Sequence, residues 1–380
     1  MAERPIPELP MPVAVTRHPS LCLSLYSILH TQYSLVFYST EPLSLRASSY
    51  APCPRVTVPT RPLTLSYICT RALFSLTPRV RCFYDPGYVF PLPEEHPFPM
   101  DKFWRAEAMI RAAGVPGLSI HGIEPATFEQ LLRVHNPEYL EQIRTGALDH
   151  VAALKLGLPA SEALLTRSRL EVAGTLAATE AALADGLACN LAGGTHHAFP
   201  DQGQGYCVLN DVAIAIREQH LSKPNLRVFV LDTDAHQGNG THAIFADDQR
   251  VFTYSIHVGK NYPSVKTPGS MDVELPRYVS GDAYLEALEC SLTTDMHAFA
   301  PDLVFWIAGA DPHEDDRFGQ MRLNDGHFAA RDEHVLNLVT RAGIPTVVLY
   351  GGGYNRDREH TARLHAATVL RAAAYQNNGV

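Results

Sequence analysis

Short apolar runs alternate with longer helical segments along most of the chain. The runs at 227–231, 302–307 and 345–350 are rich in Val, Ile, Leu and Phe. Continuous apolar runs of this length are typical of strands buried on both faces of a parallel sheet. Helices are expected around them at 212–220, 281–299, 326–341 and 359–374. This alternation predicts one α/β domain with a mainly parallel central sheet and helices on both of its faces.

The alternation begins at about residue 80. The first elements expected are a strand at 80–84, a helix at 102–113, a strand and turn at 119–123, a helix from about 127 and a long Ala- and Leu-rich helical region at 161–188. Ser161 is suited to cap this long helix. With 380 residues, 46% of them hydrophobic, the chain is long enough to bury one large core.

The first 79 residues have a different composition. They are rich in Pro, Ser, Leu and Arg and show no sustained helical or alternating period. We therefore interpret 1–79 as an irregular or disordered extension and 80–380 as the catalytic domain. Arg without Lys also resembles an organellar transit peptide, which is the alternative interpretation of this segment.

Net charge and cysteine content indicate which binding partners and which cellular location to expect. The net charge is −9, and because residues 1–79 hold seven Arg and three acids (+4), residues 80–380 carry −13. An acidic body without a basic patch argues against direct nucleic-acid binding and is compatible with cationic amine substrates. Seven Cys without C-x-x-C spacing favour a reducing, cytoplasmic location. No apolar run reaches the roughly 18 residues of a membrane helix.

Chemistry-bearing residues follow two of the predicted strands. Asp232, Asp234 and His236 alternate directly after the run at 227–231, so they share one side of the chain at the carboxyl end of a strand. Asp311 follows the run at 302–307 and is expected at the same edge. Carboxylates this close repel each other unless a cation lies between them, which predicts a metal site.

Two further segments add polar groups to this edge. His196 and His197 follow Gly193–Gly194, and Tyr354 follows three glycines after the run at 345–350. Adjacent imidazoles can move protons beside a metal ion, and the glycines let the backbone bring a phenol close to it. The combination predicts a metal hydrolase.

Taken together, these segments resemble the zinc-dependent histone deacetylase family of the arginase/deacetylase superfamily. The resemblance covers about 80–375 and is most like class IV and bacterial histone-deacetylase-like amidohydrolases. The segments that carry it are EEHPFPMDKFW, RVHNPEYL, GGTHHAFPDQGQGYCVLND, VLDTDAHQGNGTHAIF, IAGADPHEDDRFGQM and YGGGYN.

The resemblance implies a role for each matching residue. Asp234, His236 and Asp311 match the metal ligands, a donor set suited to Zn²⁺ and also to Fe²⁺. His197 matches the general base and acid, and His196 its electrostatic partner. The residues matching the remaining roles are Asp232 and Asn239 as partners of the two imidazoles, Tyr354 as the oxyanion donor, Gly205, Tyr206 and Phe318 along the substrate tunnel, and Asp232, Asp234, His236 and Ser255 around a monovalent cation such as K⁺.

The expected function is metal-dependent hydrolysis of an acyl-lysine amide, acetyl or longer, in a protein or peptide. One alternative is a small-molecule amidohydrolase such as an acetylpolyamine deacetylase. The other is a catalytically silent member that binds acyl-lysine or a partner protein. Several other histidines, His313 and His360 among them, fall outside any ligand spacing, and most of them are interpreted as helix-surface or loop residues.

Overall fold

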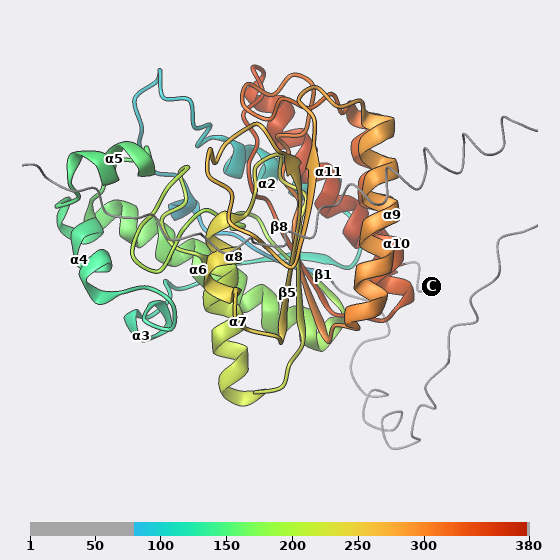
Figure 1. Cartoon of the computed structure of the whole chain (residues 1–380), viewed down its shortest axis with the longest axis horizontal. Helices are drawn as coiled ribbons and strands as arrows, with labels where there is room; N and C mark the ends of the chain where they lie inside the picture. The colour runs from blue at the N-terminus through green and yellow to red at the C-terminus, as the bar shows by residue number, and fades with distance from the viewer. Residues whose placement is uncertain (1–79, 378–380) are drawn as a thin grey trace, which may run out of the picture. The chain divides into compact units, whose positions relative to one another are not determined.

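A parallel sheet of eight strands forms the centre of the computed structural model, which describes residues 80–377 (Figure 1). Its strand order is β2-β1-β3-β8-β7-β4-β5-β6, and every pairing is parallel. The strands are β1 (Val80–Phe83), β2 (Leu118–His121), β3 (Leu187–Asn190), β4 (Val228–Asp232), β5 (Val251–Val258), β6 (Met271–Leu275), β7 (Leu303–Ile307) and β8 (Thr346–Leu349).

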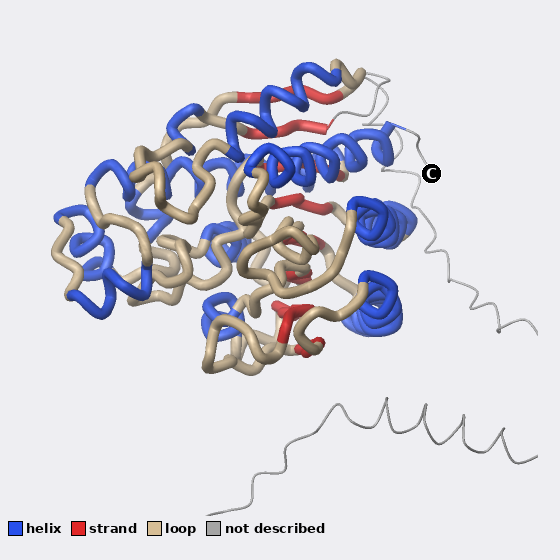
Figure 2. Tube along the Cα trace, turned by 90° about the horizontal axis from the view of Figure 1, so that it is seen from above, coloured by secondary structure: helices blue, strands red, loops and turns tan. Residues whose placement is uncertain are grey.

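Helices cover both faces of this sheet (Figure 2). On one face α6 packs against β1, β3 and β8 and against α7, while α2, α11, α10 and α9 form a row of neighbours in the other layer. The helices are α2 (Lys102–Ala113), α3 (Phe128–Leu131), α4 (Pro137–Thr145), α5 (His150–Leu156), α6 (Glu162–Asp185), α7 (Asp211–Ser222), α8 (Asn239–Phe245), α9 (Gly281–Phe299), α10 (Asp325–Arg341) and α11 (Arg358–Asn377), with a 3₁₀ turn at Pro86–Tyr88. The predicted α/β architecture is confirmed.

The three central strands, β8, β7 and β4, correspond to the apolar runs that predicted this sheet. Every residue of these strands is buried, so both faces require apolar side chains. Because β7 lies between β8 and β4, the loops that follow the three strands leave the sheet side by side. The fold thereby brings Asp232, Asp311 and Tyr354 to one edge of the sheet.

The long helical region predicted at 161–188 is shorter in the structure. Ser161 caps α6 by accepting a hydrogen bond from the backbone N–H of Leu164, as its sequence position suggested. At the other end Gly186 adopts φ +105° and stops the helix after Asp185. The chain then enters β3, and the prediction was wrong in assigning the first residues of this strand to the helix.

The interpretation of 1–79 as an extension falls on residues outside the described part of the chain. Within 80–377, none of the helices combines the length and apolar character that a membrane span requires.

Candidate metal-dependent hydrolase site

Two carboxylates and one imidazole converge at the carboxyl edge of β4 and β7. Nδ1 of His236 lies 2.8 Å from Oδ2 of Asp311 and 3.1 Å from Oδ1 of Asp234. The donor atoms of these three residues lie within 4.8 Å of one another, and all three side chains are buried. The structure therefore gathers the three predicted metal ligands into one cluster.

Backbone groups hold the two carboxylates in place. The N–H of Ala235 donates to Oδ1 of Asp311 at 2.8 Å, and the N–H of Gly352 donates to Oδ2 of Asp234 at 2.7 Å. A Cβ atom on Gly352 would lie 2.6 Å from that same Asp234 oxygen. Only glycine lets the loop after β8 approach the carboxylates this closely.

The electrostatics of the cluster fit a divalent cation. Burial and the neighbouring Asp234 carboxylate raise the pKa of Asp311 to about 8. A bound cation relieves this crowding of negative charge, and two carboxylates with one imidazole form a donor set that leaves positions open for water and substrate. Asp234, His236 and Asp311 are the residues that would hold the ion.

The first of the tandem histidines lies between two carboxylates. Nδ1 of His196 is 2.6 Å from Oδ2 of Asp232, and Nε2 is 3.9 Å from Oδ1 of Asp234. Burial alone would lower the pKa of His196, but these carboxylates raise it to about 9. His196 is therefore suited to carry positive charge at neutral pH.

The second tandem histidine has a neutral partner. Nδ1 of His197 lies 2.7 Å from Oδ1 of Asn239, and its ring centroid is 4.1 Å from that of His196. Burial, followed by the charges of His196 and His236, holds the pKa of His197 well below its usual value. A neutral imidazole that donates from Nδ1 to Asn239 has Nε2 free to accept a proton.

Tyr354 approaches the cluster from the loop after β8. Oδ2 of Asp316 accepts a hydrogen bond from the backbone N–H of Tyr354 at 2.5 Å, and Nε of Arg317 donates to its carbonyl at 3.0 Å. Burial and the Asp234 carboxylate raise the pKa of the Tyr354 phenol well above its usual value. The hydroxyl therefore stays protonated and can donate a hydrogen bond.

A pocket of about 330 Å³ leads to this cluster, and its lining includes His197, His236 and Tyr354. All three predicted tunnel residues line it, and the ring centroids of Tyr206 and Phe318 lie 5.9 Å and 5.2 Å from that of Tyr354. A Cβ atom on Gly205 would lie 2.6 Å from Cδ2 of His197, so glycine is needed where the wall meets the tandem histidines.

Comparison with known proteins agrees with this geometry. Residues 96–370 match the histone deacetylase domain model. The chain belongs to the histone deacetylase family. Histone deacetylase 2 of Arabidopsis thaliana is 30% identical over 285 residues, which cover 72% of this chain and 73% of that protein. A histone deacetylase-like amidohydrolase of Pseudomonas aeruginosa is 31% identical over 271 residues, covering 66% and 70%.

A solved structure supports the same assignment. A histone deacetylase homologue complexed with SAHA superposes with a TM-score of 0.67 at 26% identity, covering 78% of this chain and 84% of its own. Histone deacetylases and the related amidohydrolases are hydrolases that are generally metal-dependent. The family resemblance found in the sequence is thus confirmed, while the class IV assignment stays a prediction.

Several residues beside this histone deacetylase site escaped sequence reasoning. The Tyr262 ring packs edge-on against His197, with centroids 4.9 Å apart, and its hydroxyl donates to Oε1 of Gln204 at 2.9 Å. Phe98 packs against both Tyr206 and Tyr354. Tyr262 lies in a loop with no periodic pattern, so no local signal in the sequence places it over the site.

A second, smaller cavity of about 40 Å³ lies against the same cluster and is lined by Lys102, Arg167 and Glu171 among others. Lys102 is fully buried, and its Nζ donates to the carbonyl of Gly351 at 3.0 Å. The ammonium also lies 5.7 Å from the centroid of the Tyr354 ring. Burial lowers the pKa of Lys102 to about 8. The motif EEHPFPMDKFW contains this residue, but its apolar flanks alone predicted only a helix.

The monovalent-cation residues are only partly brought together by the described contacts. Asp232 and Ser255 are paired in register between β4 and β5, and both are buried. The Ser255 hydroxyl lies 3.0 Å from Nδ1 of His257. The K⁺ site with Asp234 and His236 stays a prediction.

Proposed function

We propose that this histone deacetylase family member hydrolyses the amide of short-chain acyl-lysine residues in a protein or peptide. The observation that carries the proposal is the convergence of Asp234, His236 and Asp311 beneath His197 and Tyr354, at the end of an aromatic-walled pocket. A metal ligand set, a neutral base and a hydrogen-bond donor are the groups that amide hydrolysis requires.

The proposed reaction divides between three side chains. Asp234, His236 and Asp311 would hold a divalent ion, which would supply Lewis acidity and lower the pKa of water at the site. His197, neutral because of its depressed pKa, accepts a proton at Nε2 and later delivers it to the leaving amine. The charged imidazole of His196 adds positive potential beside it, and the Tyr354 hydroxyl donates to the developing oxyanion.

The charge at the pocket supports a lysine side chain in a peptide over a polyamine. Lys155 and Arg317 are exposed and both line the pocket. An acetylpolyamine carries further ammonium groups along its chain, which these cations would repel. A lysine within a peptide presents one neutral acylated chain to the aromatic walls of Tyr206 and Phe318.

The cavity that adjoins the ligand trio supports a short acyl group. Its 40 Å³ has room for roughly three water molecules, at 10–15 Å³ each. Lys102, Arg167 and Glu171 also make its lining polar, which is a poor match for a long hydrocarbon chain.

The test is a deacylation assay of the full chain loaded with Zn²⁺ or Fe²⁺. The substrates are one peptide carrying acetyl-lysine, the same peptide carrying a long-chain acyl-lysine, and an acetylpolyamine. We expect the acetyl peptide to have the highest kcat/KM. A higher value for the acetylpolyamine or the long-chain peptide would overturn the substrate assignment.

The Tyr354→Phe variant, measured in the same assay, tests the role of the Tyr354 hydroxyl as oxyanion donor. Loss of one oxyanion donor is expected to lower kcat by about 10²–10³-fold. Absence of turnover on all three substrates by a metal-loaded chain would instead support the silent, acyl-lysine-binding alternative.

A further inference from the structure

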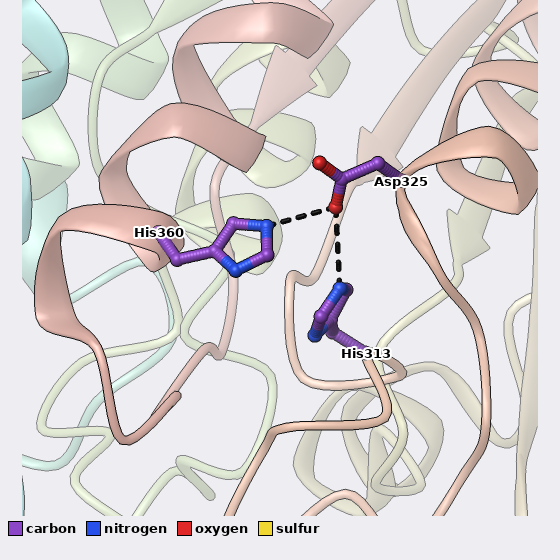
Figure 3. A group of neighbouring side chains, drawn as sticks. All are labelled: His313, Asp325 and His360. Atoms are coloured by element: carbon purple, nitrogen blue, oxygen red, sulfur yellow. Dashed lines mark hydrogen bonds and ion pairs between the residues drawn. The ribbon is translucent and has the colours of Figure 1, made fainter.

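A second group of metal-ligand side chains lies outside the hydrolase site (Figure 3). Oδ1 of Asp325 lies 2.8 Å from Nε2 of His360 and 3.2 Å from Nε2 of His313. All three donor atoms lie within 4.8 Å of one another. The arrangement therefore presents two imidazole nitrogens and one carboxylate oxygen to a common point.

Three separate segments supply this group. His313 follows the Asp311 ligand on the loop after β7, Asp325 is the first residue of α10, and His360 is in the first turn of α11. The His313 side chain is only 3% exposed and that of His360 16%, whereas Asp325 is 71% exposed. Two ligands are thus fixed by packing, and the third faces solvent, which can complete a coordination sphere.

We propose that His313, Asp325 and His360 form a second divalent-cation site, separate from the hydrolase site and suited to Zn²⁺. Two imidazoles and a carboxylate are donors that Zn²⁺ accepts, at about 2.0–2.2 Å from the ion. Tetrahedral geometry at these lengths separates neighbouring ligands by roughly 3.3 Å. The separations of 2.8 Å and 3.2 Å to Asp325 approach that value.

Asn355 supplies the hydrogen-bond partner that a metal-bound imidazole needs. Such an imidazole donates its other ring N–H to an acceptor. Nδ1 of His313 lies 3.2 Å from Nδ2 of Asn355, while Oδ1 of Asn355 is buried without a hydrogen-bond partner. The two ends of an amide are assigned from such networks. Exchanging them places an acceptor against Nδ1, and His313 can then bind the ion through Nε2 once the Asp315 N–H, which donates to Nδ1 at 3.2 Å, has moved away.

An ion at this site would act on the oxyanion donor through the backbone. Asn355 directly follows Tyr354, and it forms a bridge with Asp316, which accepts the Tyr354 N–H. Coordination would fasten the starts of α10 and α11 to the loop that carries both Asp311 and Asp316. The second site is therefore structural, and it rigidifies the loops on which the hydrolase site depends.

The competing explanation is that Asp325 only accepts hydrogen bonds from two histidines. Metal counting separates the two explanations, and it does not depend on deacylation. The His236→Ala background removes a ligand of the hydrolase site from the full chain. Equilibrium dialysis against Zn²⁺ then gives the equivalents bound by this variant and by the same variant carrying Asp325→Asn or His360→Gln.

We expect each added substitution to lower the Zn²⁺ content by one equivalent and to abolish the rise in thermal midpoint that Zn²⁺ causes. Glu314→Gln is the matched control, because it removes an exposed acid from the same loop and should keep the equivalent. The wild-type chain, which does not depend on the folding of the His236→Ala variant, should also lose one equivalent on Asp325→Asn. Unchanged Zn²⁺ content in these variants would overturn the proposal.

Discussion

The hydrolase-site trio and the trio of His313, Asp325 and His360 both combine carboxylates with imidazoles, but they differ in how exposed their carboxylates are. Asp234, His236 and Asp311 are at most 9% exposed, and the two carboxylates among them accept backbone hydrogen bonds, whereas Asp325 is 71% exposed. Loss of a cation from the first group would cost much free energy, because two buried carboxylates would then repel each other without compensation. The exposed carboxylate of the second group is solvated with or without an ion. We therefore expect tight, function-determining binding at the first site and exchangeable binding at the second.

The largest expected effect is that of Asp311→Ala. Removing one of two carboxylates should release the ion from the buried site and abolish turnover, because no other ligand replaces it. Metal analysis should then find one equivalent of Zn²⁺ still bound at the proposed second site. Retention of the buried ion by this variant would contradict the ligand assignment.

His197→Ala is expected to separate proton transfer from metal binding. The side chain lies over the trio without belonging to it, so metal content should match the wild type. Loss of the general base should lower kcat by about 10²–10⁴-fold. Steady-state kinetics and metal analysis on the same preparation provide the test, and a parallel loss of metal would argue against the assigned role.

A smaller effect is expected from Lys102, and it concerns stability. Burial lowers the pKa of this lysine from 10.5 to about 8, so between these pH values the unfolded chain binds a proton that the folded chain has lost. The free energy of unfolding should therefore gain about 3 kcal/mol from this group as pH rises from 8 to 10.5, and nothing below pH 8.

Chemical denaturation of Lys102→Met across this pH range measures that contribution. The stability difference between wild type and variant should change with pH over this range. A constant difference for Lys102→Met would show that the buried ammonium does not titrate as inferred.

The same contrast explains how much the sequence could predict. Asp232, Asp234 and His236 alternate at the end of one apolar run, and Asp311 and Tyr354 follow two others, so strand periodicity and parallel topology suffice to bring them together. His313, Asp325 and His360 come from a loop and two helix starts. These three residues lie close together because of how α10 and α11 pack, and the spacing of residues along the sequence does not predict that packing.

Other differences have the same origin. The end of α6 depends on Gly186 adopting a positive φ, and an Ala- and Leu-rich pattern continues past that residue without a change of period. Tyr262 covers His197 because its loop folds back over the pocket. Apolar periodicity predicts elements and their order, whereas loop paths and buried polar residues such as Lys102 follow from tertiary packing.

Gly352 links the metal-ligand trio to the oxyanion donor Tyr354. Its N–H fixes one carboxylate of the ligand trio, and two residues later the chain presents the Tyr354 hydroxyl. A single added methyl group there would disturb ion coordination and oxyanion stabilisation at once. Metal binding and oxyanion stabilisation in this chain thus both depend on the absence of a side chain at residue 352.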